Sequence, residues 1–317
     1  MTDLASTIRY RKLQDLAFNA LGLTCTLIGV LTLVVLFGKL AYVGGPRLMP
    51  QSVTAGSNQS RMPFLTNNDN SRRPEKAGLR TALVGTLVVM LVTFVTAVPL
   101  GIATAVYLEE YAKRNLLTNL IEINISNLAG VPSITYGLMA LWFFRSVIRL
   151  DQTSTVFVAG VTLAMLILPI VIVATREALR AIPSSIREAS YAAGAMQWQV
   201  IRYHLLPYSL GGIATGTIIA MSRAVGETAP LIVVGAAAYV NRLPPPPVMN
   251  QFPFISFDWL ASDYTVLPLQ MYNWMRNSKP AFQANAATAG LVLIAFTLSM
   301  NAIAIVVRYR VRRKLKW

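Results

Sequence analysis

Six long apolar runs constrain this chain more than any other feature of its sequence. They cover residues 17–37, 79–108, 128–148, 156–175, 210–240 and 286–307. Each run has roughly 20 or more residues, about the length that a helix needs to cross the hydrocarbon layer of a bilayer. Because lipid offers no hydrogen-bond partners, the backbone within each run must satisfy its own polar groups as a helix. The sequence therefore predicts an all-α integral membrane protein with six transmembrane helices.

The composition supports a membrane location. Hydrophobic residues make up 55% of the 317 residues and charged residues only 13%, with a mean hydropathy of +0.53. A soluble domain of this length cannot bury so much apolar surface. Basic residues precede the first run, as they do in a signal peptide, but this run is too long for a typical signal core and no clear cleavage pattern follows it. We therefore expect an uncleaved first span.

The charged ends predict the orientation. The tail RYRVRRKLKW (308–317) is strongly basic and the head also carries basic residues, and both features favour the cytoplasm. An even number of spans allows both termini to stay there. The predicted parts are then a cytoplasmic tail (1–16), a first span (17–38), a flexible extracytoplasmic loop (39–78), a core of five spans (79–307) with a cytoplasmic loop at 176–209, and the basic tail 308–317.

Several classes of site lack the residues that they need. Cys25 is the only cysteine and His204 the only histidine, so neither a disulfide framework nor a two-histidine metal site is expected. No Walker-type or Gly-rich dinucleotide loop occurs, so any nucleotide must be bound by another chain. The net charge of +15 is spread over loops and tails, which favours contact with anionic lipid over nucleic acid. We expect no catalytic residue, cofactor, metal or nucleic-acid partner, and an integral-membrane enzyme is disfavoured.

A polar segment between two apolar runs, EASYAAGAMQWQVIRYHLLP at 188–207, predicts two short helices joined by a turn. Gly194 supplies the conformational freedom for the turn, and small residues before it permit close helix approach. Pro207 is expected to stop the second helix from running smoothly onward. An ordinary amphipathic cytoplasmic hairpin is the plain alternative to a specialised role, and a structural or interfacial role is expected for His204.

This segment resembles the EAA loop of ABC-importer permeases, whose pattern is E-A-A, three residues, Gly, nine residues, Ile, one residue, Leu-Pro. Two positions depart from the pattern, since Ser190 replaces the second alanine and His204 stands at the isoleucine position. The resemblance implies that the loop docks into a cleft on an ATP-hydrolysing subunit and transmits its motion. The residues that carry this coupling role are Glu188, Ala189, Ser190, Gly194, His204, Leu206 and Pro207.

A second polar stretch, SRAVGETAPL at 222–231, lies within the fifth apolar run. Arg223 and Glu227 are four residues apart, so on a helix they share one face. Charges at membrane depth are costly unless they pair or face a cavity. Gly226 and Pro230 bracket Glu227 and favour a local kink or a close backbone approach. The chemistry leaves two interpretations open: Arg223 offers a guanidinium to a passing oxyanion while Glu227 holds it, or the two residues form a permanent pair that locks two spans together.

Together with AVYLEEYAKRNLL (105–117), AGVPSITYGL (129–138) and LPLQMYNW (267–274), this stretch resembles the phosphate-specific ABC permeases, and the PstA-type subunit in particular. The likeness covers roughly residues 79–307, and the departures lie mainly in the outer loops. It implies a MetI-like permease architecture, a bacterial inner-membrane location, and a substrate pathway with Arg223, Glu227 and Thr228. The implied partners are a dimer of ATP-binding subunits, which carry the ATPase activity, a PstC-type second permease and an extracytoplasmic phosphate-binding protein.

Two further questions stay open from the sequence. The outer segment 241–285 predicts either a platform for the binding protein or an aromatic belt at the membrane surface, through Trp259, Tyr264, Tyr272 and Trp274. The alternatives for function are a permease for another oxyanion, such as molybdate or sulfate, and an ion-coupled secondary carrier. Such a carrier needs no ATPase and would not explain the EAA spacing.

Overall fold

The computed structural model describes residues 2–48, 63–70, 73–113, 115–236, 240, 242–246 and 256–314. Helices joined by turns and loops make up these ranges. They contain no β-strand, and Thr155 and Asp263 form one isolated antiparallel bridge. The α-helices are α1 (Thr2–Leu48), α2 (Pro63–Thr66), α3 (Arg80–Val106), α4 (Leu116–Leu128), α5 (Ser133–Trp142), α6 (Val156–Arg180), α7 (Ser184–Ala192), α8 (Gln197–Val200), α9 (Leu206–Gly226), α10 (Ala229–Val234), α11 (Leu267–Met275) and α12 (Pro280–Lys314). Three π-helical turns, η1 (Tyr107–Tyr111), η2 (Phe143–Val147) and η3 (Ile201–Leu205), and one 3₁₀ turn, η4 (Asp258–Ala261), complete the described elements.

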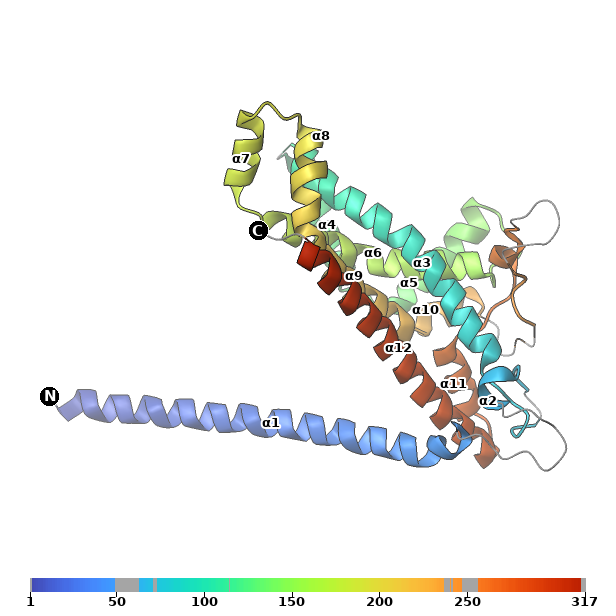
Figure 1. Ribbon diagram of the computed structural model, residues 1–317. Coiled ribbons are helices and arrows are strands. Elements are labelled where there is room, and N and C mark those ends of the chain that lie inside the picture. The colour runs from blue at the N-terminus through green and yellow to red at the C-terminus, as the bar shows by residue number, and fades with distance from the viewer. Residues whose placement is uncertain are drawn as a thin grey trace.

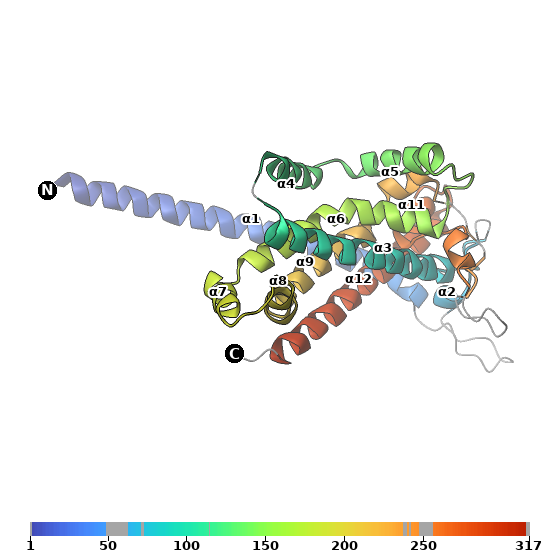
Figure 2. The same ribbon diagram turned by 90° about the horizontal axis from the view of Figure 1, so that it is seen from above.

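The helices α3, α6, α9 and α12 form a body with two distinct ends (Figure 1). The α7–α8 hairpin projects from one end, and α2 and α11 lie at the other. Figure 2 shows the N-terminal end of α1 and the C-terminal end of α12 toward the same end as the hairpin. The two predicted cytoplasmic tails and the predicted cytoplasmic loop therefore share one end of the molecule.

The number of spans agrees with the sequence only when a bent pair is counted as one. Five described helices are long and apolar enough to cross a membrane: Tyr10–Leu48, Arg80–Tyr111, Val156–Arg180, Gln197–Gly226 and Pro280–Arg310. A sixth span requires α4 and α5 with η2 together, which meet at a bend of 113°. The prediction of one helix over 128–148 is wrong, because α5 begins only at Ser133. Pro132, which precedes α5, has an extended ψ of 134° and separates it from α4.

The fifth predicted span is also displaced. The helix over this region covers Gln197–Gly226 and not 210–240. Glu227 leaves the helix with φ −83° and ψ 119°, and α10 begins two residues later. Pro230 explains the break, since a helix continued through it would lose a hydrogen bond and bring the ring against the carbonyl of Gly226. The local kink that the sequence predicts around Glu227 is confirmed.

The core of the body forms where α6 packs against α3 and α9. A Cβ atom at Gly160 of α6 would lie only 2.4 Å from Val92 of α3, and one at Gly216 of α9 would lie 2.2 Å from the Cβ of Ala174. Thr93 donates a hydrogen bond of 3.1 Å to the Gly160 carbonyl. Small residues at helix crossings are typical of membrane proteins, since they allow the backbones to approach closely.

Only the C-terminal end of α1 is fixed to the body. Gly44 packs against the backbone of Thr288 in α12, whose hydroxyl donates a 3.1 Å hydrogen bond to the Gly44 carbonyl. Arg47 donates to the Pro74 carbonyl at 3.2 Å and to the side chain of Asn285. The long apolar remainder of α1 is exposed and points away from the other helices (Figure 1).

The predicted outer loop 39–78 begins inside α1, which continues to Leu48. Most of the polar stretch 51–73 lies outside the described residues. The last part of the loop is packed, because Ala77 and Leu79 are buried with Phe64 and Trp274 in one cluster. This cluster joins the loop to α11 and to the start of α12.

Candidate functional site

The predicted helix–turn–helix is confirmed by the α7–α8 hairpin. Gly194 lies in the left-handed region with φ +83°, directly after the last turn of α7. Its N–H donates to the Tyr191 carbonyl at 2.9 Å, and the next N–H, of Ala195, donates to the Ser190 carbonyl at 3.1 Å. Left-handed glycine is the usual residue at such a helix end, because it carries no Cβ to clash. Glu188 and Ala189 are exposed on α7, whereas Ser190 is buried.

Pro207 does not end the second helix, but the helix does not run smoothly past it, as the sequence predicts. Residues Gln197–Gly226 form one continuous helix through α8, η3 and α9. Proline cannot donate a backbone hydrogen bond and its ring crowds the preceding turn. The π-helical turn of η3 lies just before it, where the N–H of Leu206 bonds five residues back to the Ile201 carbonyl. This wider turn carries the helix past Pro207, and His204 lies half-buried within it, 6.5 Å from the ring of Tyr208.

The outer surface of the hairpin is unusually apolar for a polar segment. Met196 at the turn is 74% exposed, and three aromatic side chains on the hairpin and η3 are also exposed, namely Tyr191, Trp198 and Tyr203. Large exposed apolar groups on a segment that projects from the body are accessible to another protein.

The three residues predicted for the substrate pathway are brought together at the break between α9 and α10. The Nε atom of Arg223 lies 3.5 Å from Oε1 of Glu227, although Glu227 is extended and not helical. Thr228 precedes α10, and its carbonyl accepts a 3.0 Å bond from the Ile232 N–H. The side chain of Arg223 is 41% exposed, so the guanidinium is not enclosed by its pairing with Glu227. This arrangement leaves donors of Arg223 available to an anion.

A polar contact fixes this break to the last helix. Ser222, beside Arg223, donates to Oδ1 of Asn301 in α12 at 2.6 Å. Its hydroxyl also lies 2.7 Å from the Ile218 carbonyl of its own helix. The end of α9 is therefore held against α12 by a side chain adjacent to the guanidinium.

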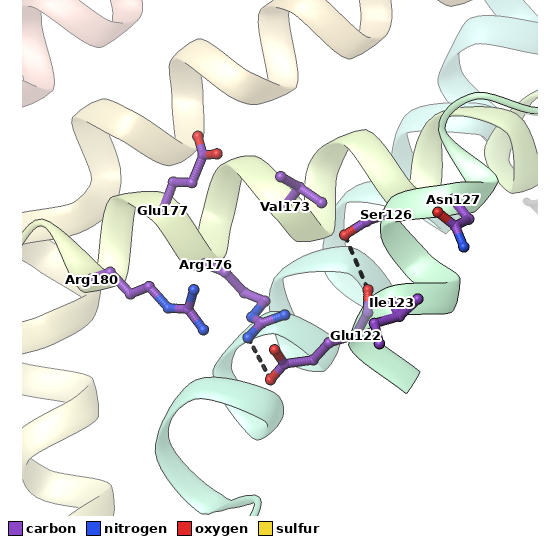
Figure 3. A pocket seen from close by; sticks show the side chains of 8 residues that line it. All are labelled: Glu122, Ile123, Ser126, Asn127, Val173, Arg176, Glu177 and Arg180. Carbon is purple, nitrogen blue, oxygen red and sulfur yellow. Dashed lines mark hydrogen bonds and ion pairs between the residues drawn. The ribbon is translucent and has the colours of Figure 1, made fainter. Parts of the chain in front are cut away.

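The structure adds a charged cluster that the sequence analysis did not single out. A cavity of about 500 Å³ lies between α4 and α6, with Arg176, Arg180 and Glu122 in its wall (Figure 3). Arg176 pairs with Glu122 at 2.6 Å and with Glu109 at 3.4 Å, while Arg180 pairs with Glu109 at 2.9 Å. The sequence could have indicated this cluster, because Arg176 and Arg180 are four residues apart at the end of the fourth apolar run and so share one helix face.

The outer aromatic residues divide into two groups. Tyr264 and Trp274 are buried in the core, so neither forms part of a surface platform or an aromatic belt. Tyr272 is 46% exposed and stacks with Arg276, whose guanidinium carbon lies 5.5 Å from the ring centre. Trp259 is half-buried. Only Tyr272 and Trp259 keep the predicted surface role.

Within the described ranges, no group of three or more His, Cys, Asp or Glu side chains is placed to hold a metal ion. Cys25 is a free cysteine on the exposed surface of α1.

Comparison with known proteins gives one matching family and several relatives. Residues 97–317 match the family described as "Binding-protein-dependent transport system inner membrane component". The chain is similar to "Phosphate transport system permease protein PstA 1" of Mycobacterium tuberculosis (strain ATCC 25618 / H37Rv), with 34% identity over 80% of this chain and 78% of that protein. It is also similar to "Phosphate transport system permease protein PstA" of Yersinia pestis, with 30% identity over 81% of each chain.

A solved structure has the same fold. The chain superimposes on a chain of the MetNI methionine ABC transporter in an inward-facing conformation with a TM-score of 0.50, covering 74% of this chain and 94% of the other. The sequence identity is 18%, so the likeness concerns the fold alone. The predicted all-α, MetI-like permease architecture is confirmed.

Proposed function

Because this chain belongs to the binding-protein-dependent transport system inner membrane component family, we propose that it is the PstA-type permease subunit of an ATP-driven importer of inorganic phosphate. Membership of this family makes the chain a multi-pass permease subunit of an ABC importer. The observation that carries the narrower proposal is the likeness to proteins named PstA, at 30% and 34% identity over about four fifths of the chain.

The α7–α8 hairpin is the proposed site of coupling to an ATP-binding subunit. It projects from one end of the body (Figure 1). Met196, in its turn, and Trp198, in α8, are exposed. Its second arm continues without a break into α9, which ends beside the Arg223–Glu227 pair. Motion imposed on the hairpin by ATP binding would thus be passed along one helix to the proposed substrate pathway. No nucleotide site is required of this chain, and the ATPase activity resides in the partner.

Phosphate suits the chemistry of the α9–α10 break. A guanidinium presents donors in a planar fork that matches the oxygens of an oxyanion. Glu227 lies close enough to Arg223 to compete with the anion for these donors, which limits how tightly the anion is held. An anion in transit must be released as well as bound, so a weakened cationic site is better suited to transport than an isolated arginine. Thr228 adds a hydroxyl at the same break.

The transport cycle that we propose is alternating access. Closure of two ATP-binding subunits carries their two docked hairpins together and opens the pathway outward, and hydrolysis resets it. A PstC-type permease would supply the second half of the pathway, and an extracytoplasmic phosphate-binding protein would deliver the anion. The hairpin and both ends of the described chain lie at one end of the molecule (Figure 2), which supports an orientation with both termini and the hairpin in the cytoplasm.

The proposal is tested by reconstituting the chain with its permease partner, the ATP-binding subunits and the binding protein in proteoliposomes. ATP-dependent accumulation of labelled phosphate is expected, and molybdate or sulfate should compete poorly. Preferential accumulation of either of those anions would identify a permease for another oxyanion. Accumulation of phosphate by the purified chain without ATP-binding subunits would instead identify a secondary carrier.

A further inference from the structure

The π-helical turn η1, at the C-terminal end of α3, carries two adjacent carboxylates that bind different elements. Glu109 pairs with Arg176 and Arg180 of α6. Glu110 instead pairs with Arg187 of α7, at 3.0 Å from Nη2 and 3.3 Å from Nε. The Glu110 side chain is only 8% exposed, so solvent screens this second pair weakly. The hairpin is thereby attached to α3, a helix that is not continuous with either of its arms.

Arg187 also binds the end of α6. Its Nη1 donates to the Ile182 carbonyl at 3.0 Å and its Nη2 donates to the Leu179 carbonyl at 3.0 Å. These carbonyls belong to the last turn of α6 and to the turn that follows, where backbone acceptors lack helical partners. One guanidinium therefore joins three elements: the end of α6, the start of the hairpin and η1.

The other arm of the hairpin reaches the same residue through the backbone. Gln197, the first residue of α8, donates from Nε2 to the Glu110 carbonyl at 2.6 Å. Glu110 thus receives its side-chain contact from α7 and its main-chain contact from α8. An apolar cluster lies beneath these contacts, formed by Val106, Leu179, Ile182, Val200, Ile201 and Leu205. The base of the hairpin is packed against α3 as well as against its flanking helices.

We propose that Glu110, Arg187 and Gln197 form a clamp that transfers displacement of the hairpin to α3 during the transport cycle. The inference rests on the proposed coupling role of the hairpin and adds a second route for the motion. Without the clamp, the hairpin would act on the core through α6 and α9, its neighbours along the chain, and would contact α3 only through the apolar cluster around Val106. With the clamp, α3, which packs against α6 at Gly101 and at Gly160, must move together with the hairpin. These three residues are positioning residues: they contact neither substrate nor nucleotide.

The test uses the complete complex in proteoliposomes and measures phosphate uptake and ATP hydrolysis in the same samples. Glu110→Gln preserves the size of the side chain. The backbone carbonyl that accepts from Gln197 also remains, but Arg187 loses its ionic partner. We expect the phosphate carried per ATP hydrolysed to fall about tenfold, within the range typical of mutations that weaken coupling between sites. ATP hydrolysis should continue and become less dependent on the binding protein. A merely structural role would lower uptake and hydrolysis together.

Three matched variants complete the experiment. Glu177→Gln makes the same chemical change at an exposed position of α6 with no ion pair in the described part of the chain, and should keep the wild-type ratio. Arg187→Gln combined with Glu110→Gln should be no worse than the more severe single variant, because the two residues act as one pair. Gln197→Met removes only the contact from α8 and should lower the ratio about threefold. Gln197→Met still tests the clamp if the complex does not assemble once the buried Glu110–Arg187 pair is lost.

A wild-type ratio of uptake to hydrolysis in Glu110→Gln, or in Gln197→Met where the former does not assemble, would overturn the clamp. Additive losses in the double variant would do so as well. The wild-type sample tests the proposed function separately. If the wild-type complex transports another anion, the ratio of uptake to hydrolysis is measured with that anion. If the wild-type complex hydrolyses ATP without transporting any anion, the proposed coupling role of the hairpin is contradicted, and the clamp with it.

Discussion

Gly137 of α5 lies directly against Pro230 of α10. A Cβ atom at position 137 would come within 2.7 Å of both the Cα and the carbonyl oxygen of Pro230, and within 3.0 Å of Val233. The contact joins two stretches that lie far apart in the sequence, AGVPSITYGL at 129–138 and SRAVGETAPL at 222–231. The short helix α10, which follows Glu227, therefore packs closely against α5, and we expect this contact to fix the position of the break beside Arg223.

Substitution of Gly137 should disturb transport without touching a charged residue. In Gly137→Val the added side chain must displace the backbone of α10, at a cost of roughly 1–3 kcal/mol for overpacking. We expect phosphate uptake to fall while the variant still co-purifies with its partners. Gly211→Val is the matched control, since no atom lies within 4 Å of a Cβ at that position. Equal uptake in the two variants would show that α5 does not position the break.

Removal of the guanidinium should abolish uptake. In Arg223→Ala the α9–α10 break loses its cation, and Glu227 then repels an approaching anion. Phosphate accumulation should drop by at least about a hundredfold, since a charged hydrogen bond contributes about 1.5–3 kcal/mol and the repulsion adds to this loss. Complex assembly should be unchanged. Arg223→Lys keeps the charge without the planar fork and should retain partial uptake. Normal uptake by Arg223→Ala would remove this residue from the substrate pathway and leave it as a partner of Glu227.

The turn of the hairpin should not tolerate a branched residue. Gly194 has φ +83° and open space around it, so Gly194→Val meets no neighbour but is strained by its backbone conformation, at about 1–3 kcal/mol. Relief of this strain would reshape the tip of the hairpin. We expect ATP hydrolysis to persist while phosphate uptake falls, as measured in proteoliposomes. Gly194→Asn, which tolerates the left-handed region better, should be affected less. Wild-type coupling in Gly194→Val would argue against docking through this turn.

The crossing of α6 and α9 should be sensitive to volume. A Cβ at Gly216 would overlap the Cβ of Ala174 at 2.2 Å, so Gly216→Val must push the two helices apart. The thermal midpoint of the detergent-solubilised complex should fall, in line with an overpacking cost of roughly 1–3 kcal/mol. Gly211→Val again provides the control, on the same helix. Unchanged midpoints for both would mean that the crossing is looser than the structure shows.

Asp69 gives a predicted pH dependence of stability. It lies outside the spans, between α2 and α3, and burial raises the pKa of its carboxyl, an effect partly offset by Gln270. A raised pKa means that the folded protein binds this proton more tightly than the unfolded chain. The stabilisation is therefore complete below about pH 4 and is lost as the pH rises through the raised pKa.

The neutral variant Asp69→Asn should remove this dependence. At pH 7 its free energy of unfolding should exceed that of the wild type by about 1.4 kcal/mol for each unit by which the pKa is raised, and its thermal midpoint should be correspondingly higher. The difference should shrink at pH 4. The exposed residue Asp151 serves as a control, and Asp151→Asn should leave the midpoint unchanged at both values. A lower midpoint for Asp69→Asn at pH 7 would contradict the direction of the shift.

The sequence predicted the elements that depend on local signals. Apolar length identified four of the six spans, and the Gly194 turn followed from residue chemistry. The errors in helix bounds occurred near prolines, because the packing of the surrounding helices determines whether a proline ends a helix or lies within it. Pro207 lies inside a helix because η3 widens the preceding turn, whereas Pro132 and Pro230 lie at true breaks. Apolar pattern alone does not distinguish these cases.

The candidate site was predicted in part for a similar reason. Arg223 and Glu227 could be paired from their spacing, because both lie in one short stretch. Glu110 and Arg187 are 77 residues apart in the sequence, and their pairing depends on how α3 and α7 meet in space. Trp274 was assigned to the surface from its residue type, but the packing of α2 and α11 buries it.

The unbroken helix from Gln197 to Gly226 has a mechanical consequence. From Trp198 to Arg223 it spans roughly 38 Å at 1.5 Å per residue, with no hinge along its length except the slight widening at η3. A stiff lever of this kind converts a small tilt at its hairpin end into a sideways shift of the Arg223 guanidinium at the far end. In the proposed transport cycle, access to this guanidinium would then change in step with nucleotide binding by the partner subunit, and no relay of separate rearrangements would be needed between the two.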